Sequence, residues 1–211
     1  SVNDIGVSAS AYAGDSLREL GVDSPVDLGN STPGLVTVNA TSGGTPIFAI
    51  RGIGLDDFSA NNTSGVGVYI DEVFASSPAY LGGRLFDVER VEVLKGPQGT
   101  LYGKNTTGGA INFISNKPSD EAQAYIELGY GRYNTVDYTG VISGPLSDTL
   151  RGRIAINGVN ADGWQTDINT GREFGDQDRT SIRGLLGFDL GGDGEAMLKV
   201  YHSRDNSTPA S

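Results

Sequence analysis

The second part of the chain is built from stretches in which apolar and polar residues alternate. Successive side chains of a β-strand point to opposite faces, so each stretch predicts a strand with one apolar face. Short connections rich in glycine, proline or asparagine separate most of the stretches, which indicates consecutive antiparallel strands. The predicted strands cover residues 123–130, 136–143, 150–157, 182–190 and 196–201. Any fold of this chain must therefore cover the apolar face of a five-stranded sheet.

Two architectures can cover such a face. A soluble β-sandwich packs it into its own core, whereas an outer-membrane β-barrel turns it towards lipid and turns its polar face towards the lumen. Arginine and lysine side chains on the polar faces favour a polar lumen. Periodicity alone leaves both architectures open. The discriminating observation is whether Ile154, Ile156, Leu186 and Phe188 form an outward band or a closed core.

The first part of the chain has a different pattern, in which strand-like runs alternate with short helical segments and glycine-rich loops. A helix is expected over residues 15–21, with Asp15 as its capping residue and Gly21 as its stop. Runs rich in β-branched and aromatic residues predict strands at 47–51, 65–73, 88–94 and 110–115. The two patterns predict a small α+β domain over residues 1–118 and a domain of antiparallel strands over residues 119–211.

Composition removes several classes of function. The chain has no cysteine and a single histidine, so a disulfide framework, a thiolate metal site and a histidine-based triad are not expected. The formal net charge is -11 and no basic stripe is present, which argues against nucleic acid as a partner. The acidic connection 158–179 misses the EF-hand spacing, and segment 96–108 misses the phosphate-loop spacing. No enzyme activity, catalytic residue, cofactor or metal site is therefore predicted.

Several segments of the first part resemble the plug domain of TonB-dependent outer-membrane receptors. They are Pro46–Ile53, Val66–Val73 and the long run Leu85–Pro118, together with residues 5–14 and 32–35 at the start. The resemblance implies an α+β plug domain followed by antiparallel strands of a transmembrane β-barrel. Residues 119–211 then correspond to the first five strands of that barrel.

The resemblance also implies that the barrel is truncated in this chain. Receptors of this family close 22 strands around the plug. Even an eight-stranded barrel has an interior filled by side chains, so five strands cannot enclose a plug. An open sheet would also leave unpaired edges, which lipid does not tolerate. No TonB-contacting segment stands before the plug in this sequence, so no coupling residue is assigned.

The function implied by the resemblance is uptake of a scarce ligand across the outer membrane of a Gram-negative-type cell. The expected ligand is a ferric siderophore, which is a small-molecule metal chelate. The plug would gate the barrel, the TonB energising complex would drive transport, and outer-membrane lipid would surround the strands. The alternative is a soluble all-β binding or adhesion module. A calcium-dependent glycan hydrolase built on the acidic connection is a third class, for which no acid and base pair can be placed.

The resemblance carries over a set of ligand-contacting residues. In this family the plug loops after the Arg-Gly-Ile segment and around the Leu-Phe-Asp segment face outward. Aromatic and amide side chains in these loops suit a bulky polar ligand, because they offer contact area and a few hydrogen bonds. The residues selected in this way are Phe58, Asn61, Asn62, Tyr80 and Phe86.

The resemblance also implies a latch between plug and barrel. Arg51 and Lys95 match positions where plugs of this family carry a base that pairs with barrel glutamates. Charge-assisted hydrogen bonds are an expected fastening for a plug in a polar lumen, because such a plug has little apolar surface to offer. Lys95 is the weaker of the two, since an ammonium lacks the bidentate fork of arginine. We expect the carboxylate partners to lie beyond Ser211.

Overall fold

The computed structural model of the protein describes residues 8–39, 45–54, 64–76, 85–192 and 194–208. Contacts between residues divide the chain into two compact units, Ser1–Ser115 and Asn116–Ser211, which we call the N-terminal and C-terminal units. The expected boundary after residue 118 differs from this division by three residues.

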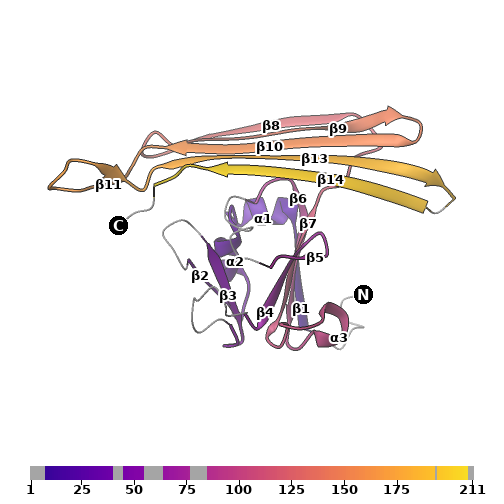
Figure 1. Ribbon diagram of the computed structural model, residues 1–211, viewed down its shortest axis with the longest axis horizontal. Coiled ribbons are helices and arrows are strands. Elements are labelled where there is room, and N and C mark those ends of the chain that lie inside the picture. The colour runs from indigo at the N-terminus through magenta and orange to yellow at the C-terminus, as the bar shows by residue number, and fades with distance from the viewer. Residues whose placement is uncertain (1–7, 40–44, 55–63, 77–84, 193, 209–211) are drawn as a thin grey trace. The chain divides into compact units, whose positions relative to one another are not determined.

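The N-terminal unit is organised around a mixed sheet with the strand order β1-β6-β7-β4-β5 (Figure 1). Strand β7 is central, antiparallel to β6 and parallel to β4. Strands β2 and β3 form a separate antiparallel pair. No helix in the described ranges is long and apolar enough to cross a membrane. The elements are β1 (Ser8–Ala13), α1 (Gly14–Glu19), η2 (Pro25–Asp27), α2 (Leu28–Ser31), β2 (Leu35–Asn39), β3 (Pro46–Ile50), β4 (Val66–Ile70), β5 (Val73–Phe74), β6 (Val88–Lys95), α3 (Gly99–Tyr102) and β7 (Gly109–Ser115).

Alternating side chains of the central strands build the core of this unit. Val91 and Val93 of β6 and Ile111 of β7 are fully buried. Val93 lies opposite Ile111 and Val91 lies opposite Phe113, so these side chains share one face of the sheet. Leu17 of α1 belongs to the same buried cluster. Burial of each such side chain stabilises the fold by about 1.5–3 kcal/mol.

Gly109 occupies a position that no other residue fits well. Its φ is +150°, which L side chains rarely adopt. A Cβ at this position would overlap the carbonyl oxygen of Leu94 and would lie 2.8 Å from Cδ1 of Ile50. Glycine is therefore required at the first position of β7, which lies between the Leu94 carbonyl of β6 and the Ile50 side chain of β3.

The turn between β4 and β5 is held by β7. Asp71 and Glu72 both have positive φ values, +49° and +68°, although neither is glycine. The Asp71 carboxylate accepts hydrogen bonds from the Ser115 amide at 2.7 Å and from the Ser115 hydroxyl at 3.0 Å. The Glu72 amide donates to Oδ1 of Asn112 at 3.3 Å. Tertiary hydrogen bonds thus fix a backbone conformation that the turn residues themselves disfavour.

The N-terminal unit differs from the prediction in three respects. The single strand predicted over residues 65–73 is interrupted, because Asp71 and Glu72 form the turn between β4 and β5. The sequence pattern does not predict β1 or β2, and β1 forms because it pairs with β6 along its whole length. The predicted capping role of Asp15 is wrong. Helix α1 begins at Gly14, its N-cap residue Ala13 makes no side-chain hydrogen bond, and Asp15 pairs with Arg18 within the helix.

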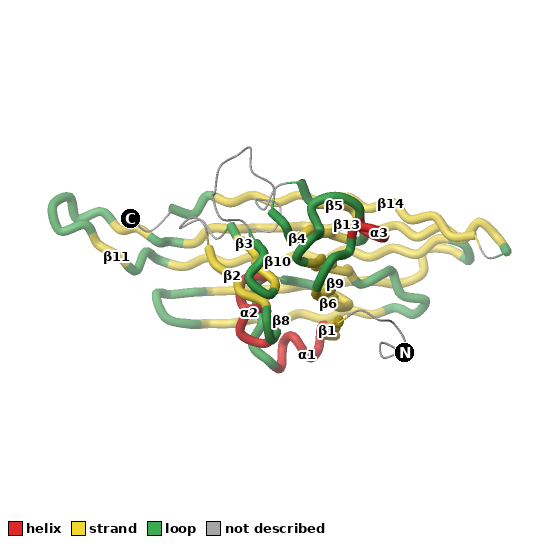
Figure 2. The backbone as a smooth tube through the Cα atoms, turned by 90° about the horizontal axis from the view of Figure 1, so that it is seen from below, coloured by secondary structure: helices red, strands yellow, loops and turns green. Residues whose placement is uncertain are grey.

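The C-terminal unit is one antiparallel sheet with the strand order β14-β13-β10-β9-β8, seen edge-on in Figure 1 and face-on in Figure 2. Each of its long strands contains one of the five stretches of alternating residues, so the prediction of five antiparallel strands is confirmed. A short two-stranded hairpin, β11–β12, lies outside this sheet. The elements are β8 (Gln123–Tyr130), β9 (Val136–Ser147), β10 (Leu150–Ala161), β11 (Gln165–Thr166), β12 (Glu173–Phe174), β13 (Gln177–Gly191) and β14 (Gly194–Asp205).

The strands of this unit are longer than the alternation predicts. The connection predicted over residues 158–179 is shorter, because β10 continues to Ala161 and β13 already begins at Gln177. The connection between the strands predicted at 136–143 and 150–157 is also shorter, since β9 continues to Ser147. Cross-strand hydrogen bonds extend pairing into polar residues, where the alternation of apolar side chains has ended.

The two faces of the sheet differ in exposure in a way that decides between the architectures. On the apolar face, Ile126 and Leu128 are more than 70% exposed. Of the four discriminating residues, Ile154, Ile156 and Phe188 are exposed and Leu186 is half-buried. Their register places them on one side of the sheet, since Ile154 lies opposite Ile142. In a soluble sandwich this face would be the closed core. The structure therefore contradicts the soluble all-β alternative and agrees with strands that turn their apolar face towards lipid.

Candidate functional site

The structure describes one of the five residues expected to contact a ligand. Phe58, Asn61, Asn62 and Tyr80 lie outside the described residues. Phe86 precedes β6 and its side chain is 8% exposed. Its packed position means that an experiment must separate a ligand contact from a role in the core, and the assignment stays a prediction.

The two predicted latch residues come together at one end of the N-terminal unit. Arg51 follows β3 with a φ of +52°, and its amide donates to the Gly34 carbonyl at 2.8 Å. Its guanidinium Nη1 lies 3.9 Å from the point that a Cβ on Gly96 would occupy. Gly96 follows Lys95, the last residue of β6. Within the described ranges neither base forms an ion pair with an acid, and the pairing with barrel carboxylates stays a prediction.

The β11–β12 hairpin carries exposed side chains that the sequence analysis did not select. Ile168 at its tip is 95% exposed, and Trp164 before β11 is more than half exposed. The Arg172 guanidinium lies 5.6 Å from the centroid of the Phe174 ring, a distance at which a cation and an aromatic face attract each other. The segment Asp167-Ile-Asn-Thr-Gly171 is a turn signal within the long connection, and it could have indicated the hairpin.

Asp167 organises the tip of this hairpin. Its Oδ1 accepts hydrogen bonds from the Asn169 amide at 2.7 Å and from the Thr170 amide at 3.3 Å. Hydrogen bonding, led by the Asn169 amide, lowers the pKa of Asp167 below its ordinary value of 3.8. A lowered pKa stabilises the hairpin above the pKa of the unfolded state, and this stabilisation is lost as the pH falls through the folded pKa.

We expect the Asn169 amide to stay protected from hydrogen exchange at pH 5 to 7 and to lose protection only as the pH falls below 3.8, through the lowered pKa of Asp167. The measurement is the exchange rate of this amide, corrected for its intrinsic pH dependence. Asp167→Asn keeps an acceptor without a titrating proton and serves as the control, so its corrected protection should not change with pH. Equal pH dependence in both proteins would contradict the role of Asp167.

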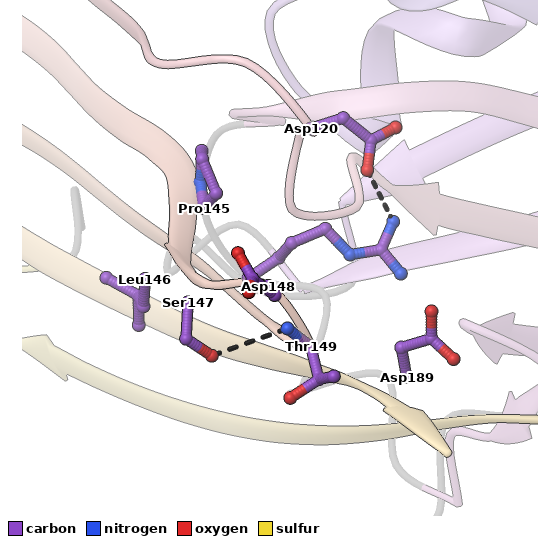
Figure 3. Close-up of a pocket in the computed structure, with 8 residues that line it drawn as sticks. Asp120, Pro145, Leu146, Ser147, Asp148, Thr149 and Asp189 are labelled. Carbon is purple, nitrogen blue, oxygen red and sulfur yellow. Dashed lines mark hydrogen bonds and ion pairs between the residues drawn. The ribbon is translucent and has the colours of Figure 1, made fainter. Parts of the chain in front are cut away.

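A polar cavity of about 430 Å³ lies at the opposite end of the C-terminal sheet (Figure 3). Its lining includes the carboxylates of Asp120, Asp148 and Asp189 and the guanidinium of Arg151. Arg151 is already paired with Asp120, at 2.9 Å between Nη1 and Oδ1. The cavity has little apolar surface with which to bind an organic ligand. Asp189 is also engaged, since its Oδ1 accepts a hydrogen bond from the Gly191 amide at 2.8 Å.

Solved structures share this fold. The ferric yersiniabactin uptake receptor FyuA from Yersinia pestis superposes with a TM-score of 0.84 at 27% sequence identity, over 96% of this chain and 32% of that chain. The pyoverdine outer membrane receptor FpvA from Pseudomonas aeruginosa, with pyoverdine bound, gives a TM-score of 0.77 over 96% of this chain and 28% of that chain, at 22% identity. The chain thus has the fold of a plug domain followed by strands of an outer-membrane β-barrel.

The sequence comparisons give the family. The TonB-dependent Receptor Plug Domain family matches residues 1–110, and the chain therefore belongs to the TonB-dependent receptors, whose location is the outer membrane. The pesticin receptor of Yersinia enterocolitica is 34% identical over 148 residues, 68% of this chain and 21% of that protein. The ferripyoverdine receptor of Pseudomonas aeruginosa is 27% identical over 208 residues, 96% of this chain and 23% of that protein. The chain thus spans about a fifth of the length of these curated relatives.

Proposed function

We propose that this chain is the N-terminal part of a TonB-dependent transporter that takes up a ferric siderophore across the outer membrane. One combined observation carries the proposal: a plug domain family matches the N-terminal unit, and the strands that follow expose an apolar face. Names of the relatives support the ligand class, since they include a catecholate siderophore receptor of Escherichia coli and a ferripyoverdine receptor. The shared ligand type is a small ferric chelate.

The same proposal assigns the partners and excludes catalysis. Outer-membrane lipid would cover the apolar face of the strands, which no described residue closes off as a core. The TonB complex would supply the energy for moving the plug, as in the family to which the chain belongs. Transport then needs a rearrangement of the N-terminal unit and no bond chemistry, so we propose a receptor and transporter and not an enzyme.

Uptake of radioactive iron tests the proposal. Cells that lack the full-length receptor and cells that carry it are given a panel of ferric siderophores, including catecholate, pyoverdine-type and yersiniabactin-type chelates. We expect energy-dependent uptake of at least one chelate only in cells that carry the receptor. Equal uptake of every ferric chelate by both strains, with the receptor present at the surface, would argue against a siderophore ligand.

Alanine at Phe58 and Phe86 in the full-length receptor is expected to weaken uptake. The physical reason is the loss of aromatic contact area to a bulky chelate. Because Phe86 is buried, surface abundance must be measured alongside uptake, and a loss of abundance would show a packing role. Leu101→Ala serves as a control, since this side chain is exposed on α3 of the same unit. Unchanged uptake in both phenylalanine variants would remove these residues from the ligand site.

Replacement of Arg51 and Lys95 by glutamine is expected to loosen the plug. Each change removes a charge-assisted hydrogen bond to a carboxylate of the complete barrel, and Arg51 should have the larger effect. The measurement is entry of a large antibiotic that the intact outer membrane excludes. Lys104→Gln is the control, because Lys104 is an exposed base in the 96–108 loop of the same unit. Wild-type exclusion in both test variants, or a full-length structure without these pairs, would contradict the latch.

A further inference from the structure

The first seven residues of the C-terminal unit, 116–122, precede β8 and are here called the junction segment. Ser119 is their central contact with the sheet. Its amide donates to Oγ of Ser143 at 2.9 Å, and its hydroxyl lies 2.8 Å from the same oxygen. Ser143 is buried in β9, and its hydroxyl donates to the Gly152 carbonyl of β10 at 3.2 Å. One buried serine therefore ties the junction segment to two strands.

A row of alternating charges, here called the charge ladder, connects the same segment to β10 and β14. Lys117 Nζ lies 3.9 Å from Oε2 of Glu195 on β14. Arg151 on β10 places Nη2 3.0 Å from Oε1 of Glu195 and Nη1 2.9 Å from Oδ1 of Asp120. The Asp120 end of this ladder is drawn in Figure 3. A single exposed ion pair stabilises little, but a forked arginine within a network of opposite charges has favourable geometry.

The chain is also fixed immediately before the junction segment. Ser115 ends β7, is buried, and donates both its amide and its hydroxyl to the Asp71 carboxylate. Three residues, Asn116, Lys117 and Pro118, separate this clamp from the Ser119 contact. Proline restricts its own φ and the conformation of the residue before it, so these three residues form a short and stiff connection.

We propose that the junction segment is an anchor that stops a conformational change of the plug domain from reaching the barrel strands. A displacement of β7 pulls on residues 116–118, which follow it directly in the chain. To reach β8, the displacement must break the Ser119 contacts, the Asp120–Arg151 pair and the Lys117–Glu195 pair together, because all of them hold the same short segment to the sheet. The N-terminal unit can then open while the strand registers of the C-terminal unit stay unchanged. The inference rests on the proposed function only for the plug movement that it describes.

Hydrogen exchange of the full-length receptor in detergent, at increasing sub-denaturing urea, tests the anchor. We expect the amides of β7 to exchange at a lower urea concentration than the Ser119 amide. The Ser119 amide should exchange at the same urea concentration as the amides of β9. In the double variant Ser143→Ala, Arg151→Gln, the peptide containing Ser119 should exchange about tenfold faster and should follow β7, because its hydrogen-bond acceptor and the ion pairs are gone. Ser143→Ala alone should shift exchange in the same direction if the double variant does not fold.

The matched control is Arg179→Gln. Arg179 on β13 pairs with Asp205 on β14 at 3.0 Å and makes no contact with the junction segment among the interactions described. Its loss should leave Ser119 exchange unchanged. Exchange of wild-type Ser119 together with β7, or wild-type protection in the Ser143→Ala variants, would overturn the anchor. The measurement uses neither ligand nor TonB, so its failure leaves the uptake proposal standing, and a failed uptake assay leaves the anchor standing.

Discussion

Gly109→Ala is expected to unfold the N-terminal unit under conditions in which the wild-type unit is folded. The methyl group would be forced into the carbonyl oxygen of Leu94, at a φ of +150° that alanine disfavours. Strain and overpacking together cost about 3–5 kcal/mol. A domain of this size is stable by only about 5–15 kcal/mol. The measurement is the urea midpoint of this unit in the full-length receptor, followed by protease accessibility of β6 and β7.

Gly99→Ala is the matched control for this experiment. Gly99 lies ten residues earlier in the same glycine-rich region, is exposed at the start of α3, and has no atom within 4 Å of an added Cβ. Alanine there should leave the free energy of unfolding, obtained from the urea titration, within about 0.5 kcal/mol of wild type. Equal midpoints for the Gly109 and Gly99 variants would show that the close approach at Gly109 relaxes at little cost.

Leu198→Arg is expected to impair assembly of the receptor in the membrane. Leu198 is exposed on the apolar face of β14, opposite Leu186 of β13. An arginine on the lipid face near the middle of a strand costs about 2–4 kcal/mol. We expect a clear drop in the folded fraction. This fraction is measured as the share of the receptor that stays folded in detergent when the sample is not heated.

Met197→Arg is the control for the lipid-facing position. Met197 neighbours Leu198 on β14, is also exposed, and points to the opposite, polar face, which already carries Lys199. We expect this variant to assemble close to the wild-type level. If both arginine variants assemble equally well, the apolar face of β14 does not contact lipid.

Alternation was sufficient to predict the C-terminal sheet, because lipid-facing strands keep a strict period of two. It was insufficient for β1, whose serine and alanine residues show no strand preference. That strand exists because β6 offers it hydrogen bonds from a distant part of the sequence. Strand ends were also missed, since pairing continues through polar residues such as Asn160 and Asp178, which lie opposite each other.

The candidate site was less predictable than the fold. Arg51 and Lys95 are 44 residues apart, and only the approach of the Arg51 guanidinium to Gly96, which follows β6, shows that they share one end of the unit. The charge ladder of the junction segment has the same character. Arg151 and Glu195 are 44 residues apart, and their pairing depends on the register of three strands. Contacts of this kind have no signature in local sequence.

The Asp71–Glu72 turn bears on the order in which the plug domain folds. A tight turn that nucleates its own hairpin normally carries asparagine and glycine. Here, two disfavoured backbone conformations are stabilised by Ser115 and Asn112, which are about 40 positions away. Closing such a long loop is entropically costly and slow, so the turn can become stable only after β7 has docked beside β4. The β4–β5 hairpin is therefore a late product of folding and not its nucleus.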